Sequence, residues 1–285
     1  MMNSISYTQN DVKKLLPTRE QNSNKGTFGR VLIIGGAPCM AGAPSFSAKA
    51  AYRMGAGLVE VFTHEKNRVI VQTLVPEAVL SVWEGNVDFI SLEKSIKKAD
   101  VIAIGMGLST SAEALDILRF TLKTAVCPIV IDADALNLIS THKELIKLSK
   151  APVIVTPHPL EMSRLSGESV EKITADILYF AQKFADDNEV ICVLKDHNTA
   201  VAQPSADTIY INQSGNSGMA TGGSGDVLDG IIAGLLAQGA EPYISATLGV
   251  YIHGLAGEIA SKMLSEYSVM ASDIIDALPK VFTDL

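Results

Sequence analysis

The sequence predicts a three-layer α/β fold built on a mostly parallel sheet, with a short antiparallel hairpin near the C-terminal third of the chain. Short apolar runs alternate with segments whose apolar residues recur at helical spacing, the pattern of strands joined by crossover helices. Two further short runs, 200–202 and 208–211, are separated by a turn and predict an antiparallel pair. We expect residues 1–285 to form one such domain.

The parallel strands are expected where short apolar runs end in glycine or polar residues. They cover 31–34, 58–62, a run that opens at 76–79, 100–104, 129–131, 153–155 and 190–194. Helical patterns cover 43–54, the region around 67–74, Val227 to a C-cap at Gly239, and Pro242 to about Lys262. Small residues along the last of these helices indicate close packing, and we expect His253 on it to be a packing residue.

Composition narrows the class of protein. With 285 residues and 47% hydrophobic content the chain can bury a sizeable core, and a net charge of -8 argues against a nucleic-acid partner. Cys39, Cys127 and Cys192 contain no Cys-x-x-Cys pair, which argues against a disulfide framework or a structural zinc site. No apolar stretch is long enough to span a membrane. We therefore expect a cytoplasmic protein with a small-molecule site and no membrane partner.

A glycine-rich stretch precedes the helix predicted from Val227. Five glycines fall between Gly215 and Gly225, so the backbone can turn through positive φ and bring its N–H groups close to a ligand. The positive end of the helix dipole lies at the same point. We expect an anion hole for a phosphate or a developing oxyanion, formed by Gly222, Gly223, Ser224 and Gly225.

Asp226 follows this loop and allows two interpretations. It can be an ionised carboxylate that accepts a proton from a substrate hydroxyl, or an ordinary N-cap of the helix. The density of glycine favours the first, because an N-cap needs only one small polar residue. The loop lacks the Gly-Lys-Ser/Thr ending of a Walker loop, and Gly35-Gly36-Ala37-Pro38 does not supply a dinucleotide-binding Gly-x-Gly-x-x-Gly.

Polar or glycine-rich turns follow several strands, at the edge where open α/β sheets bind ligands. Gly105-Met106-Gly107 is a ligand-contacting or a plain tight turn, and Asp132 and Asp134 either hold a metal or cap the next helix. His158, between two prolines, has a stiff backbone that suits a contact residue. Lys195 to Thr199 is expected opposite the glycine loop, as a phosphate contact or a solvated turn, and replacing Lys195 should leave the fold intact.

Several ordered motifs between Lys25 and Pro279 resemble those of the NAD(P)H-hydrate dehydratases, ribokinase-like enzymes that use ATP or ADP to restore hydrated nicotinamide cofactors. Residues 216–230 are similar to the anion-hole signature of that family. Its other markers are matched by Lys25-Gly26-x-Phe28-Gly29, Ala41-Gly42-Ala43, Arg53-x-Gly55-Ala56-Gly57, Gly105-x-Gly107-Leu108 and Thr156-Pro157-His158-Pro159-x-Glu161.

The resemblance implies a carbon-oxygen lyase that dehydrates the S epimer of hydrated NADH or NADPH, releasing AMP and phosphate if ADP is used. It implies Asp226 as the base, and contacts to the hydrate from Ala43, Gly105, His158 and Asp226. Nucleotide contacts are implied for Lys195, Asp196, His197, Asn198, Thr199 and Gly225. Glu161 would lie near nucleotide-bound Mg²⁺ through water, and members of the family commonly form tetramers. Asp196 departs from the family pattern, which usually has glycine there.

Two other functions fit parts of the pattern. A vitamin-precursor kinase of the same fold would stop at a phosphorylated product, and a regulatory module would bind ADP or ATP without turnover. The His158 motif and Gly105-x-Gly107 favour the dehydratase over the kinase, while the intact Asp226 disfavours the regulatory module. Stand-alone chains of this kind resemble the ADP-dependent members, so ADP is the expected co-substrate.

Overall fold

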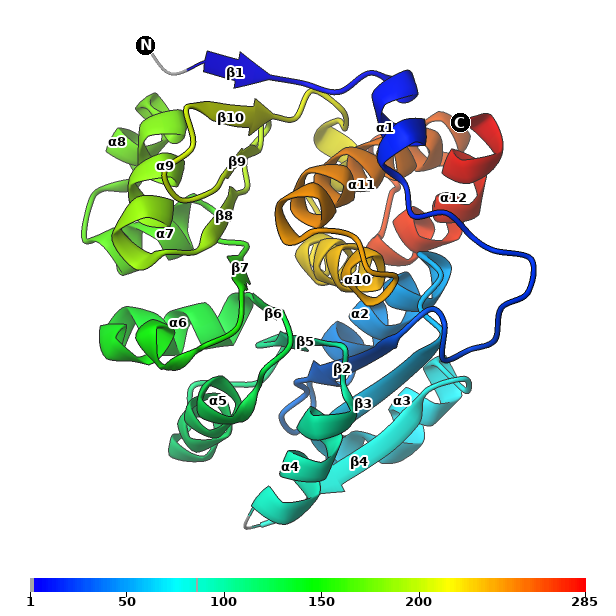
Figure 1. Cartoon of the computed structure of the whole chain (residues 1–285), viewed down its shortest axis with the longest axis vertical. Coiled ribbons are helices and arrows are strands. Elements are labelled where there is room, and N and C mark those ends of the chain that lie inside the picture. Colours follow the sequence, from blue (N-terminus) through cyan, green and yellow to red (C-terminus); the bar gives the residue numbers. More distant parts are fainter. Residues whose placement is uncertain (1–2, 86) are drawn as a thin grey trace.

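The computed structural model describes residues 3–85 and 87–285 (Figure 1). Among these residues the strands form a ten-stranded sheet in the order β1-β10-β9-β8-β7-β6-β5-β2-β3-β4. The strands are β1 (Asn3–Ile5), β2 (Arg30–Ile34), β3 (Leu58–His64), β4 (Val79–Trp83), β5 (Val101–Ile104), β6 (Ile129–Ile131), β7 (Val153–Val155), β8 (Ile191–Leu194), β9 (Ala200–Ala202) and β10 (Thr208–Ile211). The strands predicted from the apolar runs all recur in this sheet.

β9 runs antiparallel to both β8 and β10, and every other neighbouring pair in the described sheet is parallel. The predicted mostly parallel sheet with an antiparallel hairpin is therefore confirmed. Parallel strands end at the same edge of a sheet, so the turns after β2, β5, β6, β7 and β8 gather there.

The helices follow the predicted alternation with the strands. They are α1 (Gln9–Leu15), α2 (Gly42–Arg53), α3 (Arg68–Leu74), α4 (Phe89–Lys98), α5 (Ala112–Thr124), α6 (Ala133–Thr141), α7 (Pro159–Ser166), α8 (Val170–Ala175), α9 (Ile177–Asn188), α10 (Ser224–Ala237), α11 (Pro242–Leu264) and α12 (Ala271–Asp284). Short 3-10 turns are η1 (Glu65–Asn67), η2 (Lys143–Leu148) and η3 (Ser217–Met219). In the part of the chain that the structure describes, no helix is both long and apolar enough to cross a membrane.

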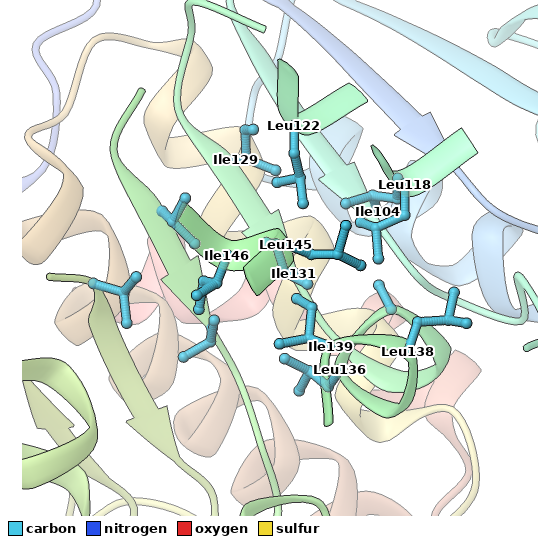
Figure 2. Packing of buried hydrophobic residues seen from close by; sticks show 14 of the residues in the cluster. Ile104, Leu118, Leu122, Ile129, Ile131, Leu136, Leu138, Ile139, Leu145 and Ile146 are labelled. Carbon is cyan, nitrogen blue, oxygen red and sulfur yellow. The ribbon is translucent and has the colours of Figure 1, made fainter. Parts of the chain in front are cut away.

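The sheet is covered on both faces. Along β2, Leu32 and Ile34 join a core shared with α4 to α9, whereas Val31 and Ile33 join a core shared with α2, α10 and α11. Figure 2 shows the first of these cores, where isoleucines of β5 and β6 meet leucines of α5 and α6. Strands buried on both faces carry continuous apolar runs, which is why the sequence pattern located them.

A third core lies between helices only, and it fixes the N-terminal segment that the sequence left unassigned. Residues of α1, α2, α10, α11 and α12 build this core (Figure 1). β1 pairs in parallel with β10, and the Tyr7 hydroxyl lies 2.9 Å from Oγ1 of Thr247 on α11. The three residues of β1 are exposed and polar in part, so no apolar pattern could reveal them.

α10 lies directly against α2 because glycine removes side chains at their contact. A Cβ built on Gly230 would lie 2.2 Å from the backbone oxygen of Ser47. Backbone cannot yield as a flexible side chain can, so α2 would have to move. The spacing of these two helices sets where the loop before α10 meets the sheet edge.

We expect Gly230→Ala to lower the free energy of unfolding by about 1–3 kcal/mol, the usual cost of overpacking a well-packed core. Gly42→Ala is the control, because its Cβ would lie 4.0 Å from the nearest atom, on Phe46, and it also lies in a helix. Urea unfolding of both variants measures the effect. Equal losses in the two variants would show that close packing at Gly230 is not what requires glycine.

Candidate active site

The glycine loop leads into α10 with free amide groups. α10 begins at Ser224, three residues before the predicted start, and its N-cap is Gly223 in the left-handed region at φ 91°. Among the described residues, no protein acceptor receives the N–H groups of Gly222, Gly223 or Gly225, whereas the Ser224 N–H donates to the Thr221 carbonyl at 3.3 Å. Three of the four expected donors are therefore available to an anion.

Asp226 lies in the first turn of α10, so the N-cap alternative for it is wrong. Its side chain is partly buried, and burial, followed by the charge of Asp132, raises its pKa to about 7, although Lys195 acts in the opposite direction. Burial therefore opposes the ionised form that we expected at this helix terminus. A carboxyl with a pKa near 7 suits a general base working at neutral pH.

Ser224 and His253 connect the glycine loop to α11. The Oγ atom of Ser224 lies 3.3 Å from Nε2 of His253, and both residues are buried. Burial lowers the pKa of His253 to about 4, so the ring is neutral at pH 7. The expected packing role of His253 is confirmed by its burial, with a hydrogen bond to the loop in addition.

Lys195 and Asp132 form an ion pair beside the glycine loop. Nζ of Lys195 lies 3.0 and 2.8 Å from the two carboxylate oxygens of Asp132. The side chains are 19% and 4% exposed, so the solvated-turn alternative is wrong for Lys195. A Cβ built on Gly225 would lie 3.2 Å from Nζ, which confirms the expected placement opposite the loop.

The ion pair also bears on Asp132 and Asp134, the acidic residues after β6, for which the alternatives are a metal ligand or a cap of α6. The Asp132 carboxylate is bound to Lys195 and makes no side-chain cap of α6, while Oδ2 of Asp134 accepts the Ser109 N–H at 2.7 Å. Ala133 between them has φ 51°, a strained value for a residue other than glycine that fixes the direction of the chain after Asp132. Within residues 3–85 and 87–285 no three metal-binding side chains cluster.

The rest of the turn after β8 is closed by its own side chains. Thr199 is buried, and its hydroxyl donates to the Asp196 carbonyl at 3.0 Å. Oδ1 of Asp196 accepts the His197 N–H at 2.8 Å, and the Asn198 amide nitrogen lies 3.1 Å from Nε2 of His197. Asp196 is not among the described residues with positive φ, so this position does not need glycine for its backbone conformation.

His158 and Glu161 form a capping box at the start of α7. Nδ1 of His158 accepts the Glu161 N–H at 3.2 Å, and the Glu161 carboxylate accepts the His158 N–H at 2.9 Å. Burial and the nearby charge of Asp132 raise the pKa of Glu161 to about 7. Burial and Lys195 lower the pKa of His158, whose side chain is 46% exposed and can therefore reach a ligand.

Gly107, two residues after Gly105, packs against Ala43. Gly105 has φ 126°, and a Cβ there would lie 1.9 Å from the carbonyl oxygen of Asp132, so the turns after β5 and β6 need glycine to approach this closely. A Cβ on Gly107 would lie 3.3 Å from Cβ of Ala43 at the start of α2. The residues expected to contact the hydrate therefore share the sheet edge at which the glycine loop lies.

Sequence reasoning gave no role to Asp229 or to Thr156, the first residue of the His158 motif. Asp229 is fully buried one turn after Asp226, and its Oδ1 accepts the Thr156 hydroxyl at 2.9 Å. The sequence did contain a signal, because Asp229 is the one charged residue between Val227 and Ala237 in an otherwise apolar helix. A buried charged type inside an apolar helix requires a partner, here the hydroxyl after β7.

A mostly parallel sheet with an antiparallel pair, and a glycine loop with free amides at the start of a helix, define a ribokinase-like α/β protein. An adenosine kinase from Sinorhizobium meliloti shares this fold, with a TM-score of 0.57 and 8% identity over 90% of this chain and 99% of that chain. The chain belongs to the NAD(P)H-hydrate dehydratase family, whose model matches residues 31–280.

Individual relatives agree with this assignment. The chain is 40% identical over 278 residues to a bifunctional NAD(P)H-hydrate repair enzyme of Moorella thermoacetica, covering 95% of this chain and 52% of that protein. It thus spans about half the length of the bifunctional relatives. It is 32% identical to the ADP-dependent (S)-NAD(P)H-hydrate dehydratase of Bacillus subtilis, over 99% of both chains. The structure of a Bacillus subtilis ADP/ATP-dependent NAD(P)H-hydrate dehydratase, co-crystallised with ATP and Mg²⁺, matches with a TM-score of 0.87 and 30% identity over 100% of this chain and 99% of that chain.

Breaking the Lys195–Asp132 pair should destabilise the fold, contrary to our expectation from sequence. We expect Lys195→Ala to lower the free energy of unfolding by about 3 kcal/mol, because Asp132 would remain buried without its partner. Lys183→Ala is the control, since Lys183 pairs with Asp187 at the surface, where side chains are 50% and 57% exposed. Its effect should stay within about 0.5 kcal/mol. Similar unfolding midpoints for the two variants would contradict a structural role for the buried pair.

Proposed function

We propose that this chain dehydrates the S epimer of hydrated NADH and NADPH with ADP or ATP as co-substrate, restoring the reduced cofactor. The observation that carries the proposal is the set of free amides in the glycine loop beside a carboxyl whose pKa lies at about 7. Such a site can bind a phosphoryl group and remove a proton from the hydroxyl that accepts it. The relatives in Moorella thermoacetica and Bacillus subtilis are named for NAD(P)H-hydrate repair.

The chemistry runs in two steps. Asp226 takes the proton of the C6 hydroxyl, the hydroxyl oxygen attacks the terminal phosphorus of the nucleotide, and the bond to the leaving AMP or ADP breaks. The N1 lone pair of the ring then expels phosphate, and loss of a proton from the neighbouring carbon restores the double bond. The amides of Gly222, Gly223 and Gly225 would stabilise charge on the transferred group, each such donor being worth about 10²–10³-fold in rate.

Lys195 to Thr199 would contact the nucleotide, with the Lys195 ammonium beside Gly225 as the cation nearest the loop. Ala43, Gly105 and His158 would contact the hydrated ring, which agrees with their place at the same sheet edge. ADP is the proposed preference, since the relatives of stand-alone length in Neisseria meningitidis and Bacillus subtilis are named ADP-dependent.

The residues present fit a role for Mg²⁺ only in part. The described chain has no cluster of three metal ligands, and one oxygen of Glu161 already accepts the His158 N–H. Phosphate oxygens of the nucleotide would therefore supply most ligands, with Glu161 contributing through water. A bound ion would neutralise phosphate charge. The related Bacillus subtilis enzyme was co-crystallised with ATP and Mg²⁺.

Three further features belong to the proposal. A single domain over residues 1–285 is supported by the continuous sheet from β1 to β4. A cytoplasmic location is supported by three free cysteines. A homo-oligomer, with a tetramer as the expected state, is supported by exposed apolar side chains around the α11–α12 connection, namely Met263, Leu264, Tyr267 and Met270.

We expect the purified protein to regenerate NADH and NADPH from their hydrates only when ADP or ATP is present, with phosphate released in equal amount. Recovery of absorbance at the reduced-nicotinamide band and a phosphate assay measure the two products. Samples without nucleotide serve as controls. A stable phosphorylated hydrate without reduced nicotinamide would instead support the kinase, and nucleotide binding without any product would support the regulatory module.

Asp226→Asn should lower turnover by about 10²–10⁴-fold while nucleotide still binds, because the amide cannot accept the hydroxyl proton. Wild-type turnover should rise with pH through about 7, where Asp226 ionises. Activity of the folded variant within a few fold of the wild type would rule Asp226 out as the base.

The same variant should change the pH dependence of stability. Burial raises the pKa of Asp226 to about 7, so between its ordinary value and pH 7 the folded protein holds a proton that the unfolded chain has released, and stability falls as pH rises. Asp226→Asn lacks this loss. Its Tm should therefore fall less than that of the wild type between pH 5 and pH 8. A parallel fall in both proteins would contradict the raised pKa.

A further inference from the structure

Asp229 has no role in the proposed chemistry, yet it is buried among charged groups of the site. It is 0% exposed on α10, and its Oδ1 accepts the hydroxyl of Thr156 at 2.9 Å. Its other oxygen, Oδ2, is buried and has no hydrogen-bond donor among the described residues. A buried carboxylate oxygen without a donor is costly, so either the group is neutral or its burial remains uncompensated.

Asp229 lies on the face of α10 that packs against Asp132, because a Cβ built on Gly225, one turn earlier on the helix, would lie 3.4 Å from Oδ2 of Asp132. Asp229 and Asp132 lie close enough for their carboxyls to share a hydrogen bond, and one is formed only if a proton lies between them. Both oxygens of Asp132 already accept from the Lys195 ammonium, at 3.0 and 2.8 Å, so this carboxylate has a cationic partner and Asp229 has none. The proton belongs on Asp229, which is the more deeply buried of the two.

We propose that Asp229 is a positioning residue that carries a proton on Oδ2 and donates it to Asp132, fixing the Asp132–Lys195 pair beside the glycine loop. Thr156, at the end of β7, fixes the opposite oxygen of Asp229. The chain of contacts from Thr156 through Asp229 and Asp132 to Lys195 thus joins α10 to the turns after β6, β7 and β8. Its consequence for the reaction rests on the proposed function, because Lys195 would act there on the nucleotide.

The charged and titratable groups around Asp229 agree with a neutral side chain. The charges of Asp132 and Lys195 compensate one another in their ion pair. Asp226 lies one turn before Asp229 on α10. Burial, with the neighbouring charge of Asp132, raises the pKa of Asp229 well above its ordinary value. An ionised Asp229 would place a third carboxylate against a single ammonium without a compensating donor.

Two substitutions at Asp229 separate the proton donor from an ionised counter-ion. Asparagine can accept from Thr156 through its oxygen and donate to Asp132 through its nitrogen, whereas leucine of similar volume can do neither. We expect Asp229→Leu to weaken nucleotide binding or lower turnover by about tenfold or more, and Asp229→Asn to recover most of that loss. A loss in Asp229→Asn as large as that in Asp229→Leu would overturn the proposal.

The pH–rate profile gives a second readout that a merely structural role would not move. A neutral Asp229 can be replaced by asparagine without changing the charge near Asp226, so the midpoint of the profile should stay where it is. An ionised Asp229 raises the pKa of Asp226 by repulsion, and Asp229→Asn would then lower the midpoint, by about one pH unit. Such a lowered midpoint would overturn the proposal.

A measurement without turnover keeps this inference separate from the proposed function. In infrared spectra of the whole chain at pH 8, a protonated carboxyl band should be present in the wild type and in Asp226→Asn, and absent from Asp229→Asn. Thr156→Val should shift this band by removing a donor, while Thr156→Ser, which keeps the hydroxyl, should not. A spectrum without the band in the wild type would overturn the proposal even if the enzyme repairs NADH hydrate normally.

Discussion

One ammonium group faces four carboxyl groups at the carboxyl edge of the sheet, and the electrostatics of the site follow from that imbalance. Lys195 forms its ion pair with Asp132, while Asp226, Asp229 and Glu161 all feel the same two charges. Burial disfavours each of these three carboxylates, and the charge of Asp132 adds to that effect while Lys195 opposes it. The carboxyls without the ion pair are therefore driven towards their protonated forms, which places the pKa of Asp226 in the range where a base is useful.

The fold creates this imbalance by bringing distant segments to one edge. Lys195 follows β8 and Asp132 follows β6, with β7 and the Thr156 turn between them in the sheet. α10 then brings Asp226 and Asp229 against that edge, at a distance set by its contact with α2 through Gly230. Strand order, not proximity in sequence, thus decides which charges meet. The site depends on helix packing as much as on its own polar contacts.

The sequence predicted the sheet because buried parallel strands carry continuous apolar runs, and it located the loop because glycine clusters have few other uses. β1 escaped notice because its partner β10 lies more than two hundred residues away and its own residues are exposed. The raised pKa of Asp226 could not be predicted from the sequence for a different reason. Local sequence shows the helix terminus that favours a carboxylate, but the desolvation and the charge of Asp132 that oppose it come from other elements. Such electrostatic contacts depend on how the chain folds and not on local sequence.

The features that suit the carboxyl edge of the sheet to a reaction also lower the stability of the folded chain. Free amides at the start of α10 have no backbone acceptor among the described residues, and a buried carboxyl with a raised pKa weakens the folded state as pH rises. A protonated Asp229 would reduce that cost without changing Asp226, because it would bind the buried Asp132 by a hydrogen bond instead of by another charge. The position one turn beyond Asp226 would then be acidic for a structural reason. An acid in its neutral form is the group that can accept from Thr156 and donate to Asp132 at once.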